Sequence, residues 1–303
     1  MAVNTISPRA GASVDRPYAH RKPFSLSHLI GRILFWALVI FILFYTIFPF
    51  FWAVAAAIKT NSDMIATPTR YWPRDIYWGN LQYVFENGDF LRALRNSAIV
   101  SIGTVLVALV FGSFAAYALG RMRFRGRSAT LYIILSMTMF PAIAILGSLY
   151  QMIRAFNLYN TIPALVITYL TFTLPFTTWV LTNFFKAMPG ELEESALVDG
   201  STPFQAFTKI LLPLALPGLV TTGLLAFIAA WNEFLYSLTF TTQDFAARTV
   251  QPAIAGFSGR NQFEEPWGAV MAASVVVTVP LVALVLIFQR KILGGLTAGA
   301  VKG

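Results

Sequence analysis

Six apolar stretches, each long enough to cross the hydrocarbon of a lipid bilayer, constrain this chain more than any other feature of its sequence. A helix rising about 1.5 Å per residue needs about 20 apolar residues to make that crossing. Backbone amides and carbonyls find no partner in lipid, and only a helix satisfies them within one segment. The sequence therefore predicts an all-α integral membrane protein of six transmembrane helices. The expected spans are Ile33–Ile58, Ser97–Gly120, Ala129–Tyr150, Thr161–Phe185, Gly218–Thr241 and Gly268–Phe288.

The composition agrees with lipid as the main solvent. Of the 303 residues, 57% are hydrophobic and 12% are charged, whereas a soluble globular domain has about 25% charged residues. The net charge of +9 falls in short clusters between the apolar spans, which argues against nucleic acid as a partner. The chain lacks cysteine, and its two histidines, His20 and His28, precede the first span. We therefore expect neither catalytic residues nor a metal site within the spans.

The distribution of lysine and arginine predicts that both termini lie in the cytoplasm. In that orientation the cytoplasmic segments hold 14 of the 22 basic residues. The outer segments hold the other eight, spread over longer loops that also contain seven acidic residues. The strongest single indication is the short loop after the second span, which contains Arg121, Arg123, Arg125 and Arg127.

The outer loop from Lys59 to Asn96 is longer than a simple turn. Its tryptophans and tyrosines suit the headgroup boundary, and Leu81, Val84, Phe85, Leu91 and Leu94 recur at helical spacing. We expect one or two helices on the outer surface, in contact either with lipid headgroups or with an outside partner. The apolar region before this loop is about twice as long as a signal-peptide core, which favours a retained span over a cleaved leader.

The cytoplasmic connection 189–217 is too polar to cross a membrane, yet its sequence predicts ordered structure. Pro189 can begin a helix, and the acidic first turn suits the helix dipole there. Gly200 is placed to end that helix, and Thr202 can cap a second one with Pro203 at its first position. Two short helices meeting at Gly200, parallel to the membrane, are expected. The acidic residues of the first turn are Glu191, Glu193 and Glu194.

The spacing within this connection resembles the EAA motif, E-A-A-x3-G-x9-I-x-L-P, of ATP-binding-cassette importer permeases. Here Glu194-Ser195-Ala196 precedes Gly200 by three residues, and nine more separate Gly200 from the Ile210–Pro213 segment. The one departure is Ser195, a small residue in place of an alanine. An ordinary connector with acidic caps would explain the glutamates but not these spacings. In the family, this loop docks into a cleft on the ATPase subunit. The coupling residues implied by the resemblance are Glu191, Glu194, Ser195, Ala196, Asp199, Gly200, Ile210 and Pro213.

Other segments extend the resemblance to roughly residues 76–303 and to the carbohydrate, maltose-type branch of binding-protein-dependent permeases. They are Asn96-Ser97, the Trp231–Phe234 segment and the block from Gly295 to Gly303. The resemblance implies a type I importer bundle that moves a sugar or oligosaccharide into the cytoplasm. It also implies a second homologous permease subunit, two ATPase subunits that bind ATP and Mg, and an extracytoplasmic sugar-binding protein. The expected location is the inner membrane of a prokaryote.

On these grounds we divide the chain into four parts. Residues 1–32 are a polar cytoplasmic tail, and 33–96 are the first span with its outer loop. Residues 97–290 form the core permease domain, which includes the coupling loop 189–217. Residues 291–303 are a cytoplasmic C-terminal tail. The chain has no G-x-x-x-x-G-K-[ST] phosphate loop, so we expect it to bind no cofactor and to depend on separate subunits for ATP hydrolysis.

Glu233 is the only acidic or basic residue within the six expected spans. Charge at that depth is costly, so Glu233 and its neighbour Asn232 should line the sugar path or contact another subunit. Thr171 and Thr178 lie on one face of the fourth span, where they either contact sugar or satisfy backbone groups freed by Pro175. The second span has a face of small residues, which predicts helix packing. That face comprises Ser97, Ser101, Thr104, Ala108, Gly112 and Ala115.

Two other classes of protein remain as alternatives. An ion-coupled secondary transporter of a small polar solute would have paired intramembrane charges and internal repeats. The sequence has one acid and no convincing repeat. A membrane-embedded enzyme needs a nucleophile and base, or a metal site, within the spans, and these are lacking.

Overall fold

The computed structural model describes residues 26–242, 246–257 and 266–297, and within these ranges every regular element is a helix. The all-α prediction is therefore confirmed. The chain divides into two units, 1–50 and 51–303. The first contains most of α1 (Leu26–Ala57), and the second contains all the remaining elements. Most of the expected N-terminal tail, residues 1–25 of 1–32, falls outside the described residues.

Four described helices are long and apolar enough to span a membrane by themselves: α1, α4 (Gly88–Arg121), α7 (Ile162–Ala187) and α14 (Trp267–Thr297). Two bent pairs also qualify if each is counted as one span. The first pair is α5 (Arg127–Met137) with α6 (Ala142–Ala155), bent by 93°. The second joins residues 203–214 to α11 (Leu216–Trp231), bent by 73°. The described part of the chain therefore has between four and six candidate spans.

The third expected span, Ala129–Tyr150, is not one straight helix, because it breaks between α5 and α6. Pro141 has no N–H to donate, and its ring disfavours helical geometry at Phe140. The backbone there makes tight turns instead, with Phe140 N–H donating to the carbonyl of Met137 at 3.3 Å. The apolar run continues through the break, which is why hydropathy alone missed it.

The fifth expected span, Gly218–Thr241, is also interrupted. Helix α11 ends at Trp231, and a separate short helix, α12 (Leu235–Phe240), follows it. At the end of α11 the carbonyl of Ile228 accepts both the backbone N–H of Asn232 at 3.1 Å and its side-chain amide at 2.9 Å. The sixth expected span, Gly268–Phe288, agrees with the apolar span Trp267–Gln289, and helix α14 continues beyond it to Thr297.

The outer loop contains two short helices, α2 (Asn61–Met64) and α3 (Gly79–Glu86). Leu91 and Leu94, which we expected in a surface helix, belong to α4, whose start at Gly88 is capped by the side chain of Asn87. The loop is held by polar contacts around two residues buried within it. Lys59 donates to the carbonyl of Arg70 at 2.5 Å, and Asp63 accepts from the side chain of Arg70.

The pKa values of both buried groups are shifted, for different reasons. The hydrogen bond from Arg70 lowers the pKa of Asp63 below its usual value, although burial opposes that shift. Burial lowers the pKa of Lys59, against the opposing effect of the nearby Asp63 carboxylate. The Lys59 ammonium also lies 4.3 Å from the centre of the Trp52 ring, so the cation has an aromatic partner as well as a carbonyl.

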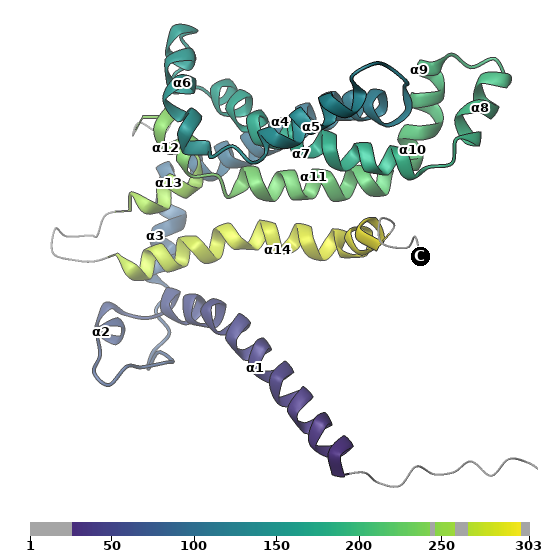
Figure 1. Ribbon diagram of the computed structural model, residues 1–303. Helices are drawn as coiled ribbons and strands as arrows, with labels where there is room; N and C mark the ends of the chain where they lie inside the picture. Colours follow the sequence, from purple (N-terminus) through teal and green to yellow (C-terminus); the bar gives the residue numbers. More distant parts are fainter. Residues whose placement is uncertain (1–25, 243–245, 258–265, 298–303) are drawn as a thin grey trace, which may run out of the picture. The chain divides into compact units, whose positions relative to one another are not determined.

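Helix α4 packs closely along α7, and α11 packs against both (Figure 1). A Cβ added to Gly112 of α4 would lie 2.7 Å from Cγ2 of Thr177 on α7. The predicted small-residue face of α4 is buried from Ser97 to Gly112, as expected of a packing surface. At its end, however, Ala115 is partly exposed and Ala116 is buried instead.

Many hydroxyl groups in these helices donate to carbonyls of their own helix. Such bonds remove the cost of burying an unpaired polar group without needing a partner on a neighbouring helix. The donors are Ser113, Thr168, Thr173, Thr182, Thr221, Ser274 and Thr278.

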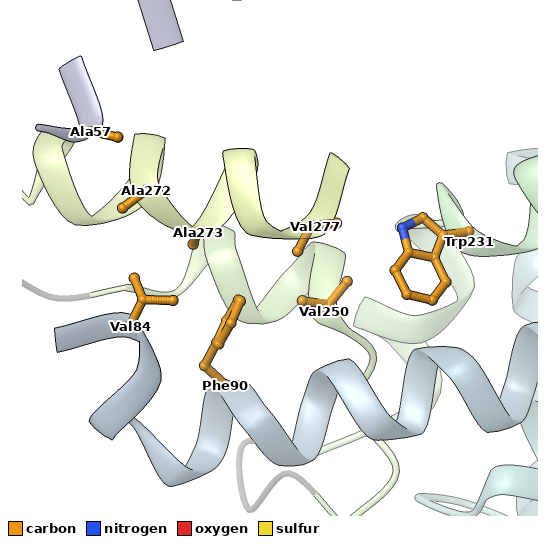
Figure 2. Packing of buried hydrophobic residues seen from close by; sticks show 8 residues of the cluster. All are labelled: Ala57, Val84, Phe90, Trp231, Val250, Ala272, Ala273 and Val277. Atoms are coloured by element: carbon orange, nitrogen blue, oxygen red, sulfur yellow. The ribbon is translucent and has the colours of Figure 1, made fainter. Parts of the chain in front are cut away.

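A second packing centre lies where α14 meets α3, α11 and α13 (Val250–Ala255). Figure 2 shows small alanines of α14 facing Val84, Phe90 and Val250. The whole cluster comprises Ala57, Val84, Phe90, Trp231, Val250, Ala272, Ala273 and Val277. The remaining elements are α8 (Glu191–Val198), α9 (Pro203–Ala206), the π-helical turn η1 (Phe207–Leu211) and α10 (Leu212–Leu214).

The contact at Gly112 makes a testable prediction. Gly112→Ala should lower the free energy of unfolding by about 1–3 kcal/mol, because the new methyl group overpacks the α4–α7 contact. Gly147→Ala is the matched control, since it lies inside α6 with nothing within 4 Å of an added Cβ. In the control, the free energy of unfolding should rise by up to about 1 kcal/mol, because alanine has a higher helix propensity than glycine. Thermal unfolding in detergent would compare the two, and equal shifts would contradict the proposed close contact.

Candidate coupling loop and translocation path

The connection between α7 and α11 contains the first helix of the expected coupling loop, α8. This helix begins at Glu191, not at Pro189, which lies outside it. The negative charges of the glutamates in its first turn interact favourably with the positive end of the helix dipole. Gly200 has a φ of +84°, a left-handed conformation that ends the helix. Its N–H donates to the carbonyl of Leu197 at 3.1 Å, and Ser201 N–H donates to that of Ala196 at 2.9 Å.

The second helix of the loop begins as its sequence predicted. The Thr202 hydroxyl accepts from Gln205 N–H at 3.3 Å, and the Gln205 side chain accepts from Thr202 N–H at 2.9 Å. This reciprocal capping box satisfies two free amides at the start of α9. The chain then widens into η1, where Leu212 N–H donates to the carbonyl of Phe207. Pro213 has no N–H to donate, and it lies in the first turn of α10, where a helix tolerates proline.

The loop has an inner face and an outer face. Ala196, Phe207 and Leu211 are buried, the last two in a hydrophobic cluster with residues of α4 and α7. On the outer face Val198 is 87% exposed. Phe204 is 62% exposed, and its ring stacks on that of Phe114 of α4 with the ring centres 6.4 Å apart. Of the predicted coupling residues, Ala196 points inward and Ile210 is partly exposed. The others are exposed: Glu191, Glu194, Ser195, Asp199, Gly200 and Pro213.

The sequence did not single out the residue that ties α8 to the rest of the bundle. Glu193 accepts a hydrogen bond from the Tyr117 hydroxyl at 2.6 Å and another from Nε of Arg121 at 3.1 Å. Arg121 also donates to the carbonyls of Met188 and Pro189, at 3.0 and 2.8 Å. Tyr117 and Arg121 are four residues apart on α4, so both side chains lie on one face. That spacing is visible in the sequence, but nothing there pairs it with Glu193.

A second arginine of the cluster after α4 has a structural partner as well. Arg127 donates from Nε to the carbonyl of Leu119 and from Nη2 to that of Gly120, each at 2.7 Å. These carbonyls belong to the last turn of α4, where the intrahelical partners run out. Arg121 and Arg127 therefore stabilise the ends of helices. They also contribute to the positive charge from which the orientation in the membrane was predicted.

The candidate path residues Asn232 and Glu233 lie in the break between α11 and α12. The Glu233 carboxylate accepts from the N–H groups of Tyr236 and Ser237, at 2.7 and 3.1 Å, so it caps the start of α12. The side chain is partly exposed. Sequence reasoning considered sugar contact and subunit contact for Glu233 but missed this capping role.

The two path candidates on α7 have partners within the helix bundle. The Thr171 hydroxyl donates to the carbonyl of Thr168 at 2.6 Å. Thr178 is 2% exposed, and its backbone nitrogen lies near Gly112, where α4 and α7 approach closely. Thr171 therefore has the bond to its own helix that backbone repair requires, and Thr178 lies in a helix-packing contact; their contact with sugar stays a prediction.

The Asn96-Ser97 pair also has a clear structural partner. The Asn96 side chain donates to the carbonyls of Ala246 and Arg248, and the Ser97 hydroxyl accepts from Val250 N–H at 2.8 Å. The Ser237 hydroxyl of α12 accepts from Thr249 N–H at 3.0 Å. Side chains from two helices thus satisfy the irregular backbone before α13, which would otherwise be buried without partners.

Comparison with known proteins gives the class of the chain. Residues 108–295 match the family model described as "Binding-protein-dependent transport system inner membrane component". The trehalose transport system permease protein of Mycobacterium tuberculosis is 40% identical over 273 residues, which cover 90% of this chain and 98% of that protein. The trehalose/maltose transport system permease protein of Thermococcus litoralis is 40% identical over 261 residues, or 85% and 92% of the two chains.

The fold agrees with this match. A bacterial ABC transporter involved in the import of the acidic polysaccharide alginate contains a chain that superposes with a TM-score of 0.76 at 21% identity. The superposition covers 88% of this chain and 98% of that one. The chain therefore belongs to the family of binding-protein-dependent inner membrane components, among the permeases of carbohydrate ABC importers.

The turn at Gly200 makes a prediction about the loop itself. Gly200→Ala should destabilise the turn by about 1 kcal/mol or more, because a side chain strains the left-handed backbone even where there is open space. Hydrogen exchange at positions 200 and 201 should become about fivefold faster. Gly190→Ala is the control in the same loop, since Gly190 has an ordinary φ of −65°. Equal exchange in both variants would contradict the conformational role of Gly200.

Proposed function

We propose that this chain is the transmembrane permease subunit of an ABC importer that moves a sugar or oligosaccharide into the cytoplasm. The observation that best supports this function is the connection between α7 and α11. It is a capped, structured loop with a buried inner face and an outer face of exposed apolar and acidic residues. Val198, exposed next to Asp199 at the turn between the two loop helices, suits a surface that a partner subunit covers.

The proposed partner of this outer face is an ATPase subunit. The chain has no phosphate-binding loop of its own, so the energy for transport has to come from separate subunits that bind ATP and Mg. In this proposal Glu194, Asp199 and Gly200 meet the ATPase directly, with Glu191 and Ser195 beside them. Ala196 supports the loop from its inner face, and Ile210 and Pro213 set the direction in which it leaves the bundle.

The proposed topology has six spans and both termini in the cytoplasm of a prokaryotic cell, within the inner membrane. It counts the α5–α6 pair as one span and α11 with its bent extension as another. Figure 1 shows α8 and α9 at one end of α7 and α11, with α12 and α13 at the other, and α14 runs towards the α8 end. Arg121 and Arg127, which the positive-inside rule assigns to the cytoplasm, lie at that same end.

The remaining proposed partners follow from the family. They are a second homologous permease subunit, which completes the pore, and an extracytoplasmic sugar-binding protein that delivers the substrate. Asn232 and Glu233 remain the proposed path residues, since Asn232 is exposed and Glu233 is partly exposed beside the helix break. The sugars in the names of the relatives, trehalose and maltose, are the first substrates to test.

The competing proposal is an ion-coupled secondary transporter. It would need charged groups in the bundle that change partners during transport. Glu233, the acid that sequence analysis placed within a span, has both carboxylate oxygens bonded to backbone amides of α12. That arrangement suits a structural cap better than a group that exchanges ions.

The ATPase contact can be tested with one pair of exposed aliphatic residues. Val198→Asp should weaken co-purification with the ATPase subunit by about tenfold or more, because the contact would bury an unpaired carboxylate. Ile65→Asp, at an 84% exposed residue of the outer loop, is the control and should retain the ATPase. The complex would be co-expressed from the neighbouring reading frames. Equal retention of the ATPase by both variants would contradict the proposed docking face.

Reconstitution separates the two classes of transporter. Liposomes that contain the complete complex should accumulate trehalose or maltose only with ATP and the binding protein present. Liposomes that contain this chain alone should show no accumulation under a proton or sodium gradient. Accumulation by the chain alone would establish the secondary transporter instead.

A further inference from the structure

The strongest feature that the proposed function leaves unexplained is the set of contacts around Glu193. Glu193 on α8 bonds to Tyr117 and Arg121 near the end of α4, and Arg121 in turn donates to the carbonyls of Met188 and Pro189, just after α7. The Glu193 side chain is 20% exposed, and that of its partner Arg121 is 11% exposed. Both carboxylate oxygens accept hydrogen bonds from α4, across sequence separations of 76 and 72 residues.

The contact is reinforced by apolar packing just inside it. The Tyr117 ring lies 4.7 Å from that of Phe207 in η1 and 6.3 Å from that of Phe185 in α7. Phe185 and Phe207 are themselves 5.9 Å apart, between ring centres. The hydroxyl of Tyr117 therefore points from a buried aromatic cluster towards a charged group on the coupling loop. Such a hydrogen bond to a charged acceptor, shielded from water, is stronger than an exposed one.

The loop is continuous in sequence with α7 and α11, the helices that precede and follow it. Helix α4 is not connected to the loop in sequence, yet it packs along the length of α7 and contacts α11. A displacement of α8 would reach α4 directly only through side-chain contacts. The Glu193 contact is charged, has two hydrogen bonds to α4, and lies at the base of α8.

We propose that Glu193, with Tyr117 and Arg121, is a positioning site that makes α4 move together with the coupling loop. This inference rests on the proposed function and adds the route by which the loop acts on the bundle. Docking of the ATPase requires only the outer face of the loop. Conversion of ATP hydrolysis into transport also requires this inner contact, so loss of the contact should uncouple the two activities.

The experiment uses the complete reconstituted complex and measures the amount of sugar taken up per ATP hydrolysed. Glu193→Ala should keep the ATPase bound and active but lower this ratio about tenfold, because it removes two hydrogen bonds to a charged group. Tyr117→Phe removes one of them, keeps the ring in its aromatic cluster, and should lower the ratio about threefold. Arg125→Gln, at an exposed arginine in the loop after α4, is the control and should leave the ratio unchanged.

A double-mutant cycle distinguishes this role from general stabilisation. Tyr117→Phe should have little further effect on the ratio in the Glu193→Ala background, because the shared hydrogen bond is already absent. If Glu193→Ala loses ATPase binding and uptake in proportion, Glu193 only shapes the docking face and the inference is wrong. An unchanged ratio in both variants would also overturn it. If the wild-type chain binds no ATPase, the proposed permease function itself is wrong. That result is distinct from one in which the ATPase binds but the Glu193 variants leave the ratio unchanged.

Discussion

The close approach of α4 to α7 is the constraint on which the rest of the structure depends. In lipid, apolar side chains gain little by contacting each other instead of acyl chains, so helices associate through close packing and polar contacts. Glycines allow this close packing at several positions along the helices. Gly112 faces Thr177, Gly120 faces Phe185, and Gly218 of α11 faces Phe184. These contacts fix the helix ends from which the coupling loop departs, and therefore the direction in which the loop projects.

The coupling loop combines local and distant determinants. Its two helices follow from capping residues that act within a few positions, such as Thr202 with Gln205, and from the left-handed turn at Gly200. Its attachment to the bundle depends instead on residues far apart in sequence, chiefly the contact of Glu193 with Tyr117 and Arg121. The outer face can therefore meet a partner while the inner face stays fixed to the membrane helices.

The difference between local and distant determinants explains what could be predicted from the sequence. Helix α7 was predicted closely, because its start at Thr161 and its long apolar run are both local signals. The break at Pro141 was missed because the surrounding residues stay apolar, so hydropathy does not change there. The cap that Glu233 gives to α12 was missed for a related reason, since a continuous span was assumed. The partners of Glu193 and Asn96 could not be found from one sequence, because spacing along the chain does not reveal which helices become neighbours.

The hydroxyl groups bonded within their own helices have a consequence for motion. The hydroxyls of Thr168, Thr173 and Thr182 donate to carbonyls of α7 itself, and the hydroxyl of Ser113 donates to a carbonyl of α4. Because these four hydroxyls donate within their own helices, none of their bonds has to break when α4 and α7 slide or tilt past each other. A transporter needs helices that hold together in lipid and still shift by small steps. Inward-facing serine and threonine of this kind let the α4–α7 interface stay closely packed and still allow small sliding movements.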